Sequence, residues 1–188
     1  MIIERRIIME KWDLYTIDRE KINHVITRGD DVPKDLYHLV VHVCIFNAKN
    51  QMLIQQRQSF KEGWPNMWDV TVGGSAIIGE NSRQAAMREV AEELGLKIDL
   101  ENISPVITKY FSEGFDDIYI LEKEIDISKL ILQYEEVQAV KWAGIEEILD
   151  MIGLKKFIPY DESFIHFLFH LHQVNSLYQK QVCARCRV

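Results

Sequence analysis

Three glutamates stand close together in a segment of the chain that is rich in helix-forming residues. Glu89, Glu92 and Glu93 lie within the run SRQAAMREVAEEL, which contains no Gly or Pro and is followed by Gly95. Residues three and four positions apart share one face of a helix, with Cβ atoms roughly 5–6 Å apart. Carboxylates held so closely repel one another unless a cation lies among them. Because Mg²⁺ and Mn²⁺ prefer carboxylate oxygen and keep positions free for water and phosphate, the spacing predicts a Mg²⁺ or Mn²⁺ site.

A pair of glycines and an arginine complete this candidate site. Gly73 and Gly74 follow an apolar run, and consecutive glycines let the backbone approach a ligand and turn a carbonyl toward a metal. Arg88 stands four residues before Glu92, so an ion pair between them is available on the helix surface. A bare acidic run is most often a solvated helix face. Such a face does not need the glycines, Arg88 or Gly95, and we therefore interpret the segment as a functional site.

The segment 74–96 as a whole resembles the Nudix box, the signature of Mg²⁺-dependent hydrolases that split a diphosphate linked to some other group. Its pattern is Gly74, five residues, Glu80, seven residues and then REVAEELGL. In such enzymes metal ions polarise the phosphoryl group and activate a water, which attacks phosphorus in line. The resemblance implies a diphosphate hydrolase whose general base is Glu89, Glu93 or a carboxylate from another loop. The sequence alone does not choose among these three.

The same resemblance implies a role for each residue of the candidate site. Glu80 is expected further from the metal than the helix glutamates. Glu136, ahead of Trp142, stands where many relatives contribute an additional base or metal ligand, and a solvated loop is the alternative interpretation. The implied metal ligands are Glu89, Glu92, Glu93 and the backbone carbonyl of Gly73, and the implied catalytic residues are Glu93, Glu89 and Arg88.

The region 28–74 resembles one branch of that family, the isopentenyl-diphosphate isomerases and their hydrolase relatives. The similarity lies in the strand YHLVVHVCIFN, in Arg57 with Lys61, and in the segment WPNMWD. In the isomerases an Arg and a Lys at these places hold the substrate diphosphate, a ligand that suits a bidentate guanidinium and a compact ammonium. We therefore interpret Arg57 and Lys61 as substrate-binding residues, with two solvated loop charges as the alternative.

Two departures from the isomerase pattern argue against isomerase activity. Isomerases carry a catalytic Cys at the place of Gly73 and a metal-binding His at the place of Ser75. Without that thiol and that His, the protonation and deprotonation of an isoprenoid double bond lose their machinery. His38 matches another isomerase metal ligand, but without its partners we interpret it as a strand-edge residue. An isomerase-like enzyme and a non-catalytic regulator that binds a nucleotide or metabolite are kept as alternatives to the hydrolase.

The predicted elements alternate as in an α/β or α+β domain. Strands are expected over residues 39–47, 51–57, 68–72, 106–111, 118–125 and 137–142, helices over 82–94, 145–152 and 161–179, and an N-terminal β-hairpin over 12–27. Asp116 and Asp117 are expected in the loop after Phe111, where they could reach the candidate site or serve as turn residues. With the resemblance, this layout implies a Nudix-type α/β/α sandwich, a mixed β-sheet between helices. We expect one domain over residues 1–188, with a core of about 35–150.

Composition and charge narrow the class of protein. With 188 residues, 47% hydrophobic and 27% charged, the chain can bury a sizeable core. The opening MIIERRIIMEK interrupts its apolar residues with charges, so no secretory signal is expected. No membrane span is expected either, because the sequence has no run of about 18 apolar residues. The net charge of −7 disfavours a nucleic-acid polymer as partner, and it does not exclude the small-molecule diphosphate that the resemblance implies.

The three cysteines give no disulfide framework and suit the cytoplasm, and the role of the lone pair Cys183 and Cys186 is left open. The apolar C-terminal helix and the N-terminal strand are compatible with a homodimer, although composition does not separate a dimer contact from an internal one.

Overall fold

The computed structural model describes residues 9–185, and within the last helix it describes side chains up to residue 174. The strands are β1 (Lys11–Tyr15), β2 (Lys21–Thr27), β3 (His38–Phe46), β4 (Met52–Arg57), β5 (Trp68–Asp69), β6 (Val72–Ser75), β7 (Ile107–Phe111), β8 (Gly114–Glu122) and β9 (Val137–Ala143). The helices are α1 (Ser82–Leu94), α2 (Ile145–Gly153) and α3 (Glu162–Arg185), with a short 3₁₀ turn at Ile127–Lys129. Cys183 and Cys186 lie outside the residues whose side chains are described.

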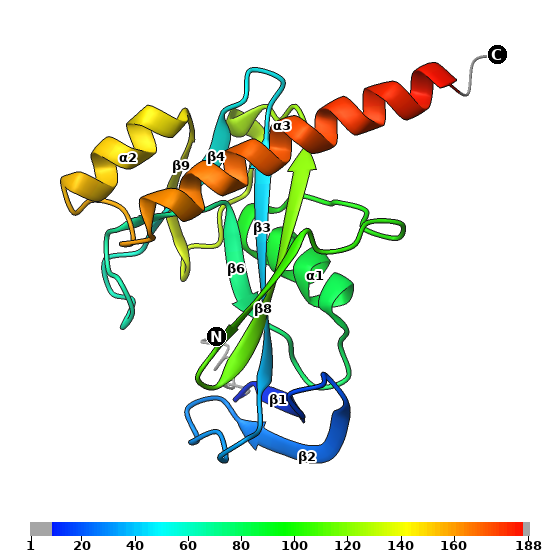
Figure 1. Ribbon diagram of the computed structural model, residues 1–188. Helices are drawn as coiled ribbons and strands as arrows, with labels where there is room; N and C mark the ends of the chain where they lie inside the picture. Colours follow the sequence, from blue (N-terminus) through cyan, green and yellow to red (C-terminus); the bar gives the residue numbers. More distant parts are fainter. Residues whose placement is uncertain (1–8, 186–188) are drawn as a thin grey trace.

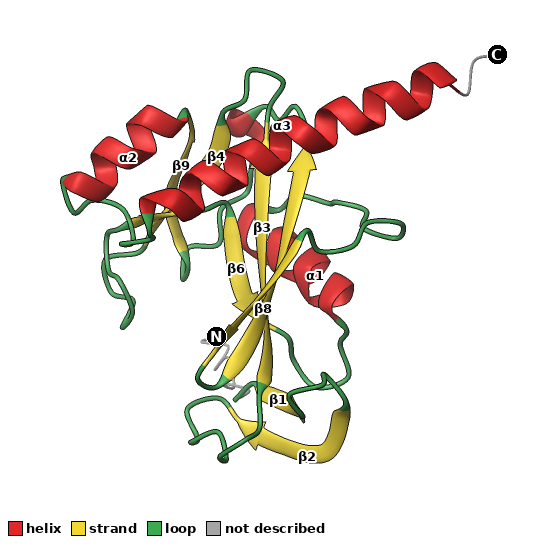
Figure 2. Ribbon diagram, in the orientation of Figure 1, coloured by secondary structure: helices red, strands yellow, loops and turns green. Residues whose placement is uncertain are grey.

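A seven-stranded mixed sheet forms the centre of the molecule, and β1 pairs with β2 in a separate N-terminal hairpin (Figure 2). Strand β3 runs parallel to β8 along its whole length, from His38 beside Gly114 to Phe46 beside Glu122. A strand has only two edges, so β6 and β4 must share the other edge of β3. Strand β6 pairs with residues 40–43 of β3 and β4 pairs at Phe46. The sheet is therefore split between β6 and β4, and this split is where the candidate site lies.

Helices cover both faces of the sheet, which confirms the predicted sandwich (Figure 1). Alternate residues of β3 point to opposite faces. Leu39, Val41, Val43 and Ile45 join the core cluster that contains Ala85, Ala86, Val90 and Leu94 of α1. Cys44 and Phe46 join the cluster that contains Ile148 of α2 and Ile165, Leu168 and Phe169 of α3. Among the helices in the described part of the chain, none combines the length and apolar character that a membrane crossing needs.

The limits of α1 follow from local interactions at its two ends. Asn81 accepts a hydrogen bond from the backbone N–H of Gln84, and the Gln84 side chain accepts one from the backbone of Asn81, which forms a capping box. Gly95 ends the helix with a φ of 64°, a left-handed conformation that glycine adopts without steric penalty. The prediction of a helix over residues 82–94 is thus confirmed, and the glutamates share a rigid frame.

The predicted start of β8 at Ile118 is wrong, because the strand begins at Gly114. Acidic residues are depleted in strands, and this led to the expectation of a loop at Asp116 and Asp117. Both aspartates instead lie within β8. Asp117 is fully buried there because Arg19, in the β1–β2 turn, donates two hydrogen bonds to it of 2.8 and 2.7 Å. A contact between residues 98 positions apart in sequence therefore overrides the local preference.

Candidate active site

A polar cavity of about 110 Å³ lies between β6 and the glutamate-bearing face of α1. Its lining combines five carboxylates with the glycine pair and includes Glu10, Arg28, Gly73, Gly74, Ser75, Glu89, Glu92, Glu93, Gln133 and Glu136. The structure thus brings together the four predicted metal ligands and Glu136. One arginine among so many carboxylates leaves the cavity with a negative potential, which attracts cations.

Glu93 is the most deeply buried carboxylate of the cavity, with 4% of its surface exposed. Gln55 of β4 donates a hydrogen bond of 2.9 Å from Nε2 to Glu93 Oε2. Burial and then the nearby charge of Glu89 raise the pKa of Glu93 well above its usual range, and the Gln55 hydrogen bond only partly opposes this. The amide oxygen Oε1 of Gln55 is itself buried without a hydrogen-bond partner.

Arg88 holds the acidic residues around it, as the sequence predicts. Its guanidinium lies 2.7 Å from Glu80, 3.0 Å from Glu89 and 2.9 Å from Glu92. It also donates a hydrogen bond of 3.0 Å to the carbonyl of Ser75, which connects α1 to β6. Burial raises the pKa of Glu89 to about 7 even though Arg88 acts in the opposite direction. One cation therefore does not compensate for the burial of Glu89.

The two glycines of β6 contact different faces of the sheet. A Cβ atom on Gly74 would lie 2.1 Å from Glu89 Oε1, so only glycine leaves room for that carboxylate. A Cβ atom on Gly73 would lie 2.6 Å from Nε2 of His42, on the opposite face. The His42 ring therefore occupies the space that a side chain at position 73 needs. This position is the one at which the resembling isomerases carry their catalytic cysteine.

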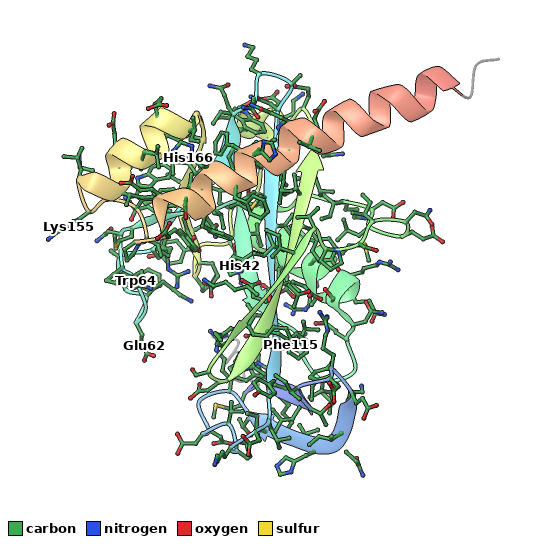
Figure 3. The ribbon with its side chains drawn as sticks, viewed as in Figure 1. His42, Glu62, Trp64, Phe115, Lys155 and His166 are labelled. Carbon is green, nitrogen blue, oxygen red and sulfur yellow. The ribbon has the colours of Figure 1, made fainter. Side chains whose placement is uncertain are left out.

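Neither Arg57 nor Lys61 lines the cavity, and Lys61 contacts it through Glu136. Lys61 forms an ion pair with Glu136, with Nζ 2.6 Å from Oε2. Arg57 donates a hydrogen bond of 2.9 Å to the carbonyl of Gly63, and its Nη1 lies 3.9 Å from Asp69. Figure 3 shows Glu62 and Trp64 on the loop that follows β4, and His42 in the central sheet. The predicted diphosphate-binding pair thus lies outside the cavity lining, and each of the two side chains has an acidic neighbour.

Several residues of the site were not predicted from the sequence. Gln55 could have been predicted, because it is a polar residue two positions after buried Leu53 in β4. Residues two positions apart in a strand share one face, so Gln55 faces the same side as Leu53. Glu10 and Arg28 carried none, since the N-terminal hairpin brings them to the cavity through tertiary contacts. Asp69 lies 3.9 Å from Arg57, and its charge helps to raise the pKa of Glu93. No sequence pattern around Asp69 predicted this position.

Comparison with known proteins identifies the family. The NUDIX domain model matches residues 36–168. An uncharacterised Nudix hydrolase of Listeria innocua is 46% identical over 170 residues, which cover 90% of this chain and 99% of the relative. An isopentenyl-diphosphate Delta-isomerase of Citrobacter koseri is 30% identical over 125 residues, 63% of this chain and 68% of that enzyme.

Solved structures agree with this relationship. A crystal structure of a Deinococcus radiodurans protein aligns with a TM-score of 0.70 and 25% identity, over 85% of this chain and 99% of the other. A MutT protein from Methanosarcina mazei shares the fold, with a TM-score of 0.53 at 20% identity, over 70% of this chain and 92% of that chain. By its domain match and its hydrolase relatives, this chain belongs to the Nudix family and is a Nudix hydrolase.

Proposed function

We propose that this protein is a Mg²⁺- or Mn²⁺-dependent hydrolase that cleaves the diphosphate linkage of a small organic or nucleoside-diphosphate derivative by water attack at phosphorus. The observation that carries the proposal is the pair Glu89 and Glu93, two carboxylates with raised pKa values in one polar cavity. A protein gains nothing in stability from two such groups together, and perturbed acids in a cavity are typical of functional sites.

The donor set fits a divalent cation. Glu89, Glu92, Glu93 and the carbonyl of Gly73 would hold it, since all four residues line the cavity. As they stand, no three His, Cys, Asp or Glu side chains of the described residues are grouped closely enough to coordinate an ion. Glu89 and Glu92 are paired with Arg88, so the cation would share these two carboxylates with the guanidinium. When bound, such an ion polarises a phosphoryl oxygen and lowers the pKa of a coordinated water.

Glu93 is our choice for the group that accepts the proton of the attacking water. Its partner Gln55 is a neutral amide that fixes one oxygen, whereas Glu89 is paired with the cationic Arg88, which reduces its basicity. The depth of Glu93 in the cavity excludes bulk water from the proton transfer. Arg88 positions Glu89 and Glu92 and stays outside the cavity lining.

Arg57 and Lys61 would hold the substrate diphosphate at the rim of the split. Lys61 reaches the cavity through Glu136, and an anionic substrate would take the ammonium from that carboxylate. The released Glu136 carboxylate would then be available as a further metal ligand or base. A homodimer, predicted from the apolar terminal segments, stays a prediction.

Isomerase activity is the weaker candidate, although the chain is 30% identical to an isopentenyl-diphosphate isomerase. Position 73 is glycine, and His42 fills the space of the missing thiol. The regulator alternative does not explain why Glu89 and Glu93 are kept together in one cavity, because a binding-only protein has no use for two repelling carboxylates.

The test is a turnover assay with Mg²⁺ or Mn²⁺ on nucleoside-diphosphate sugars, dinucleotides, nucleoside triphosphates and isoprenoid diphosphates. The reaction is run in ¹⁸O-labelled water, because label recovered on phosphate identifies attack at phosphorus. Glu93→Gln is expected to lower kcat about 100-fold or more. Glu146→Gln, an exposed glutamate of α2, is the matched control and should behave as the wild type.

Turnover without a divalent cation, or full turnover by Glu93→Gln, would contradict the proposed mechanism. Conversion of isopentenyl diphosphate to its allylic isomer would favour the isomerase. Ligand binding without any turnover would favour the regulator.

A further inference from the structure

The N-terminal hairpin brings two charged residues to the carboxylate cavity. Glu10 and Arg28 both line it, and Arg28 is the one basic residue of this lining in the part of the chain that the structure describes. The NUDIX domain model begins at residue 36, so both residues lie outside the part of the chain that matches the family. The hairpin therefore adds a cation to a cavity whose other charged residues are acidic.

The pairing of β1 with β2 places the two side chains together. The backbone N–H of Arg28 donates a hydrogen bond of 2.8 Å to the carbonyl of Glu10, one residue beyond the paired residues Lys11 and Thr27. Residues directly opposite each other in an antiparallel pair share one face. Arg28 Nη1 accordingly lies 2.9 Å from Glu10 Oε2. The side chains are 56% and 40% exposed, so a ligand that enters from solvent can reach the guanidinium.

Backbone hydrogen bonds hold the hairpin against the loop between β6 and α1. The carbonyl of Lys11 accepts a hydrogen bond of 2.7 Å from the N–H of Ile78. The buried Asp13 accepts one of 2.7 Å from the N–H of Gly79. These contacts fix the hairpin relative to the strand and the helix that form the cavity. Arg28 is thus supported by regular elements, as a group that must bind a ligand in one geometry requires.

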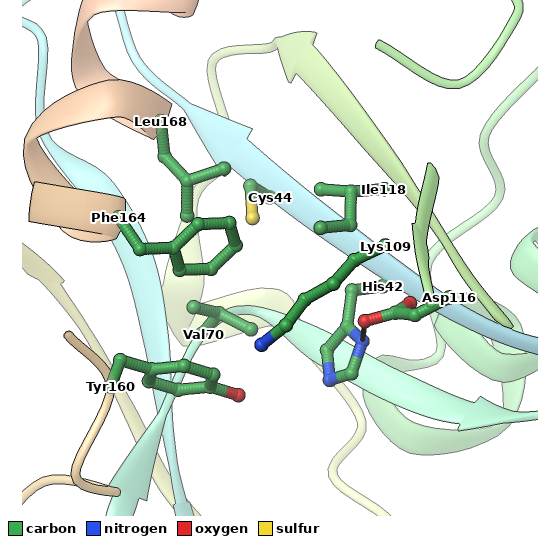
Figure 4. Close-up of a pocket in the computed structure, with 9 residues that line it drawn as sticks. All are labelled: His42, Cys44, Val70, Lys109, Asp116, Ile118, Tyr160, Phe164 and Leu168. Carbon is green, nitrogen blue, oxygen red and sulfur yellow. Dashed lines mark hydrogen bonds and ion pairs between the residues drawn. The ribbon is translucent and has the colours of Figure 1, made fainter. Parts of the chain in front are cut away.

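Other cations near the cavity are already engaged or lie elsewhere. Arg88 is paired with three glutamates and stays outside the cavity lining. Lys109 lies on the opposite face of the sheet, where it lines a separate small hollow with His42 and Asp116 (Figure 4). Arg28 has Glu10 as its acidic partner, and one bond from Nη1 leaves most of the five guanidinium donors for a ligand.

We propose that Arg28 is a substrate-contacting residue, which donates hydrogen bonds to non-bridging oxygens of the phosphoryl group in the carboxylate cavity, and that Glu10 holds its guanidinium in the absence of substrate. The inference rests on the proposed hydrolase function. A planar guanidinium suits two phosphate oxygens at once. Negative charge is spread over these oxygens during phosphoryl transfer, so a cation beside them favours the reaction. Arg57 and Lys61, outside the lining, would hold the rest of the diphosphate.

The kinetic test uses Arg28→Met and Arg28→Lys at saturating Mg²⁺, with the substrate that the wild type cleaves fastest. Arg28→Met should lower kcat/KM about tenfold or more, because a charge-assisted hydrogen bond to phosphate is lost. Arg28→Lys keeps the charge without the planar fork and should recover part of the loss. Lys129→Met, which removes a cation from an exposed ion pair outside the cavity lining, is the matched control and should leave kcat/KM unchanged.

Glu10→Gln separates a substrate contact from a structural link. If Arg28 only fastens the hairpin through Glu10, both substitutions break the same link and lower kcat/KM and Tm alike. In our proposal Glu10 competes with the substrate for the guanidinium, so Glu10→Gln should raise kcat/KM about two- to threefold, an effect that matches a weak exposed ion pair. Asp126→Asn, the same kind of change at the exposed pair, is its control.

A binding test needs no turnover. Methylenediphosphonate, a diphosphate analogue whose bridging carbon resists hydrolysis, is titrated by calorimetry into each variant with Mg²⁺, and the thermal transition checks folding. The Kd should rise about tenfold in Arg28→Met and stay at the wild-type value in Lys129→Met. Such weakening in a protein that hydrolyses nothing supports the inference and removes only the proposed function.

Hydrolysis by the wild type with unchanged kcat/KM and Kd in Arg28→Met would overturn the present inference alone. An equal fall of kcat/KM in Arg28→Met and Glu10→Gln would overturn it as well, because the pair would then be a structural link. The absence of both turnover and binding of the analogue would overturn the two proposals together.

Discussion

The two sides of strand β6 carry contrasting chemistry. On the α1 side, five carboxylates surround a polar cavity. On the α3 side, His42, Lys109 and Tyr160 lie above an apolar floor. The adjacent residues Gly73 and Gly74 point to these opposite sides. The contrast teaches that two adjacent glycines in a strand can bring two unlike environments to within the thickness of one backbone.

A second contrast, between buried carboxylates, shows which acids serve the fold. Burial alone would raise the pKa of Asp117, but hydrogen bonds from Arg19 and Thr108 outweigh it and lower the pKa. No comparable donors surround Glu93, and burial raises its pKa. Asp117 therefore attaches the N-terminal hairpin to the sheet. Glu93 carries an uncompensated cost, which a structural role does not require.

The largest effect on kcat is expected from a substitution that adds a side chain on the α1 side of β6. Gly74→Ala would place a Cβ atom 2.1 Å from Glu89 Oε1, so the carboxylate must move away from the cavity. We expect kcat to fall about 100-fold, because a displacement of about 1 Å in a catalytic group has an effect of this size. Gly153→Ala, where no atom lies within 4 Å of the new Cβ, is the control. Steady-state kinetics decide, and a kcat within threefold of the wild type would show that Glu89 is not needed.

The pH dependence of stability tests the uncompensated carboxylates without turnover. Glu89 has a pKa of about 7 in the folded protein and an ordinary value of 4.5. Between these values the folded state keeps a proton that the unfolded state has released, so stability falls as the pH rises from 4.5 to 7. The shift sets an upper limit of about 3 kcal/mol, and partial access of water reduces the expected loss to about 1–2 kcal/mol.

Urea unfolding of metal-free protein at pH 5 and pH 8 measures this loss. Glu89→Gln should flatten the dependence, and Mg²⁺ should stabilise the wild type more at pH 8 than at pH 5, because the cation competes with the proton. Equal stability of the metal-free wild type at both pH values would show that burial does not raise the pKa of Glu89.

The predicted part of the α1 side is local in sequence, whereas Glu10 and Arg28 reach the cavity only through tertiary contacts. The glutamates, Arg88 and the glycine pair lie within one segment, and the helical repeat fixes the positions of the side chains. The α3 side could not be predicted in this way. His42, Lys109, Asp116 and Tyr160 come from β3, β7, β8 and the loop before α3, and only the sheet pairing brings them together.

The mistaken start of β8 had the same origin. The partner that allows Asp117 in a strand is Arg19, on a turn near the other end of the chain. Local preference describes the separate strands well, but it contains no information on which distant cation compensates a buried acid.

A smaller effect is expected from Arg57 and Lys61, the predicted diphosphate-binding residues outside the cavity lining. Arg57→Ala and Lys61→Ala should each raise KM about tenfold with little change in kcat, because a phosphate held in the ground state contributes uniform binding. Lys129→Ala, with its ammonium on an exposed surface, is the control. If the thermal transition drops and KM is unchanged, the two residues only stabilise the loop through Gly63 and Glu136.

The smallest effect is expected from a substitution that adds a side chain on the α3 side of β6. Gly73→Ala would place a Cβ atom 2.6 Å from His42 Nε2, the far end of a side chain that can tilt. Because Asp116 keeps its hydrogen bond to the other nitrogen of the ring, the tilt is small, and we expect kcat and KM both to stay within about threefold of the wild type. Gly74→Ala should lower kcat instead. If Gly73→Ala lowers kcat as far as Gly74→Ala does, His42 and Gly73 take part in the catalytic site, and the two sides of β6 are not separate.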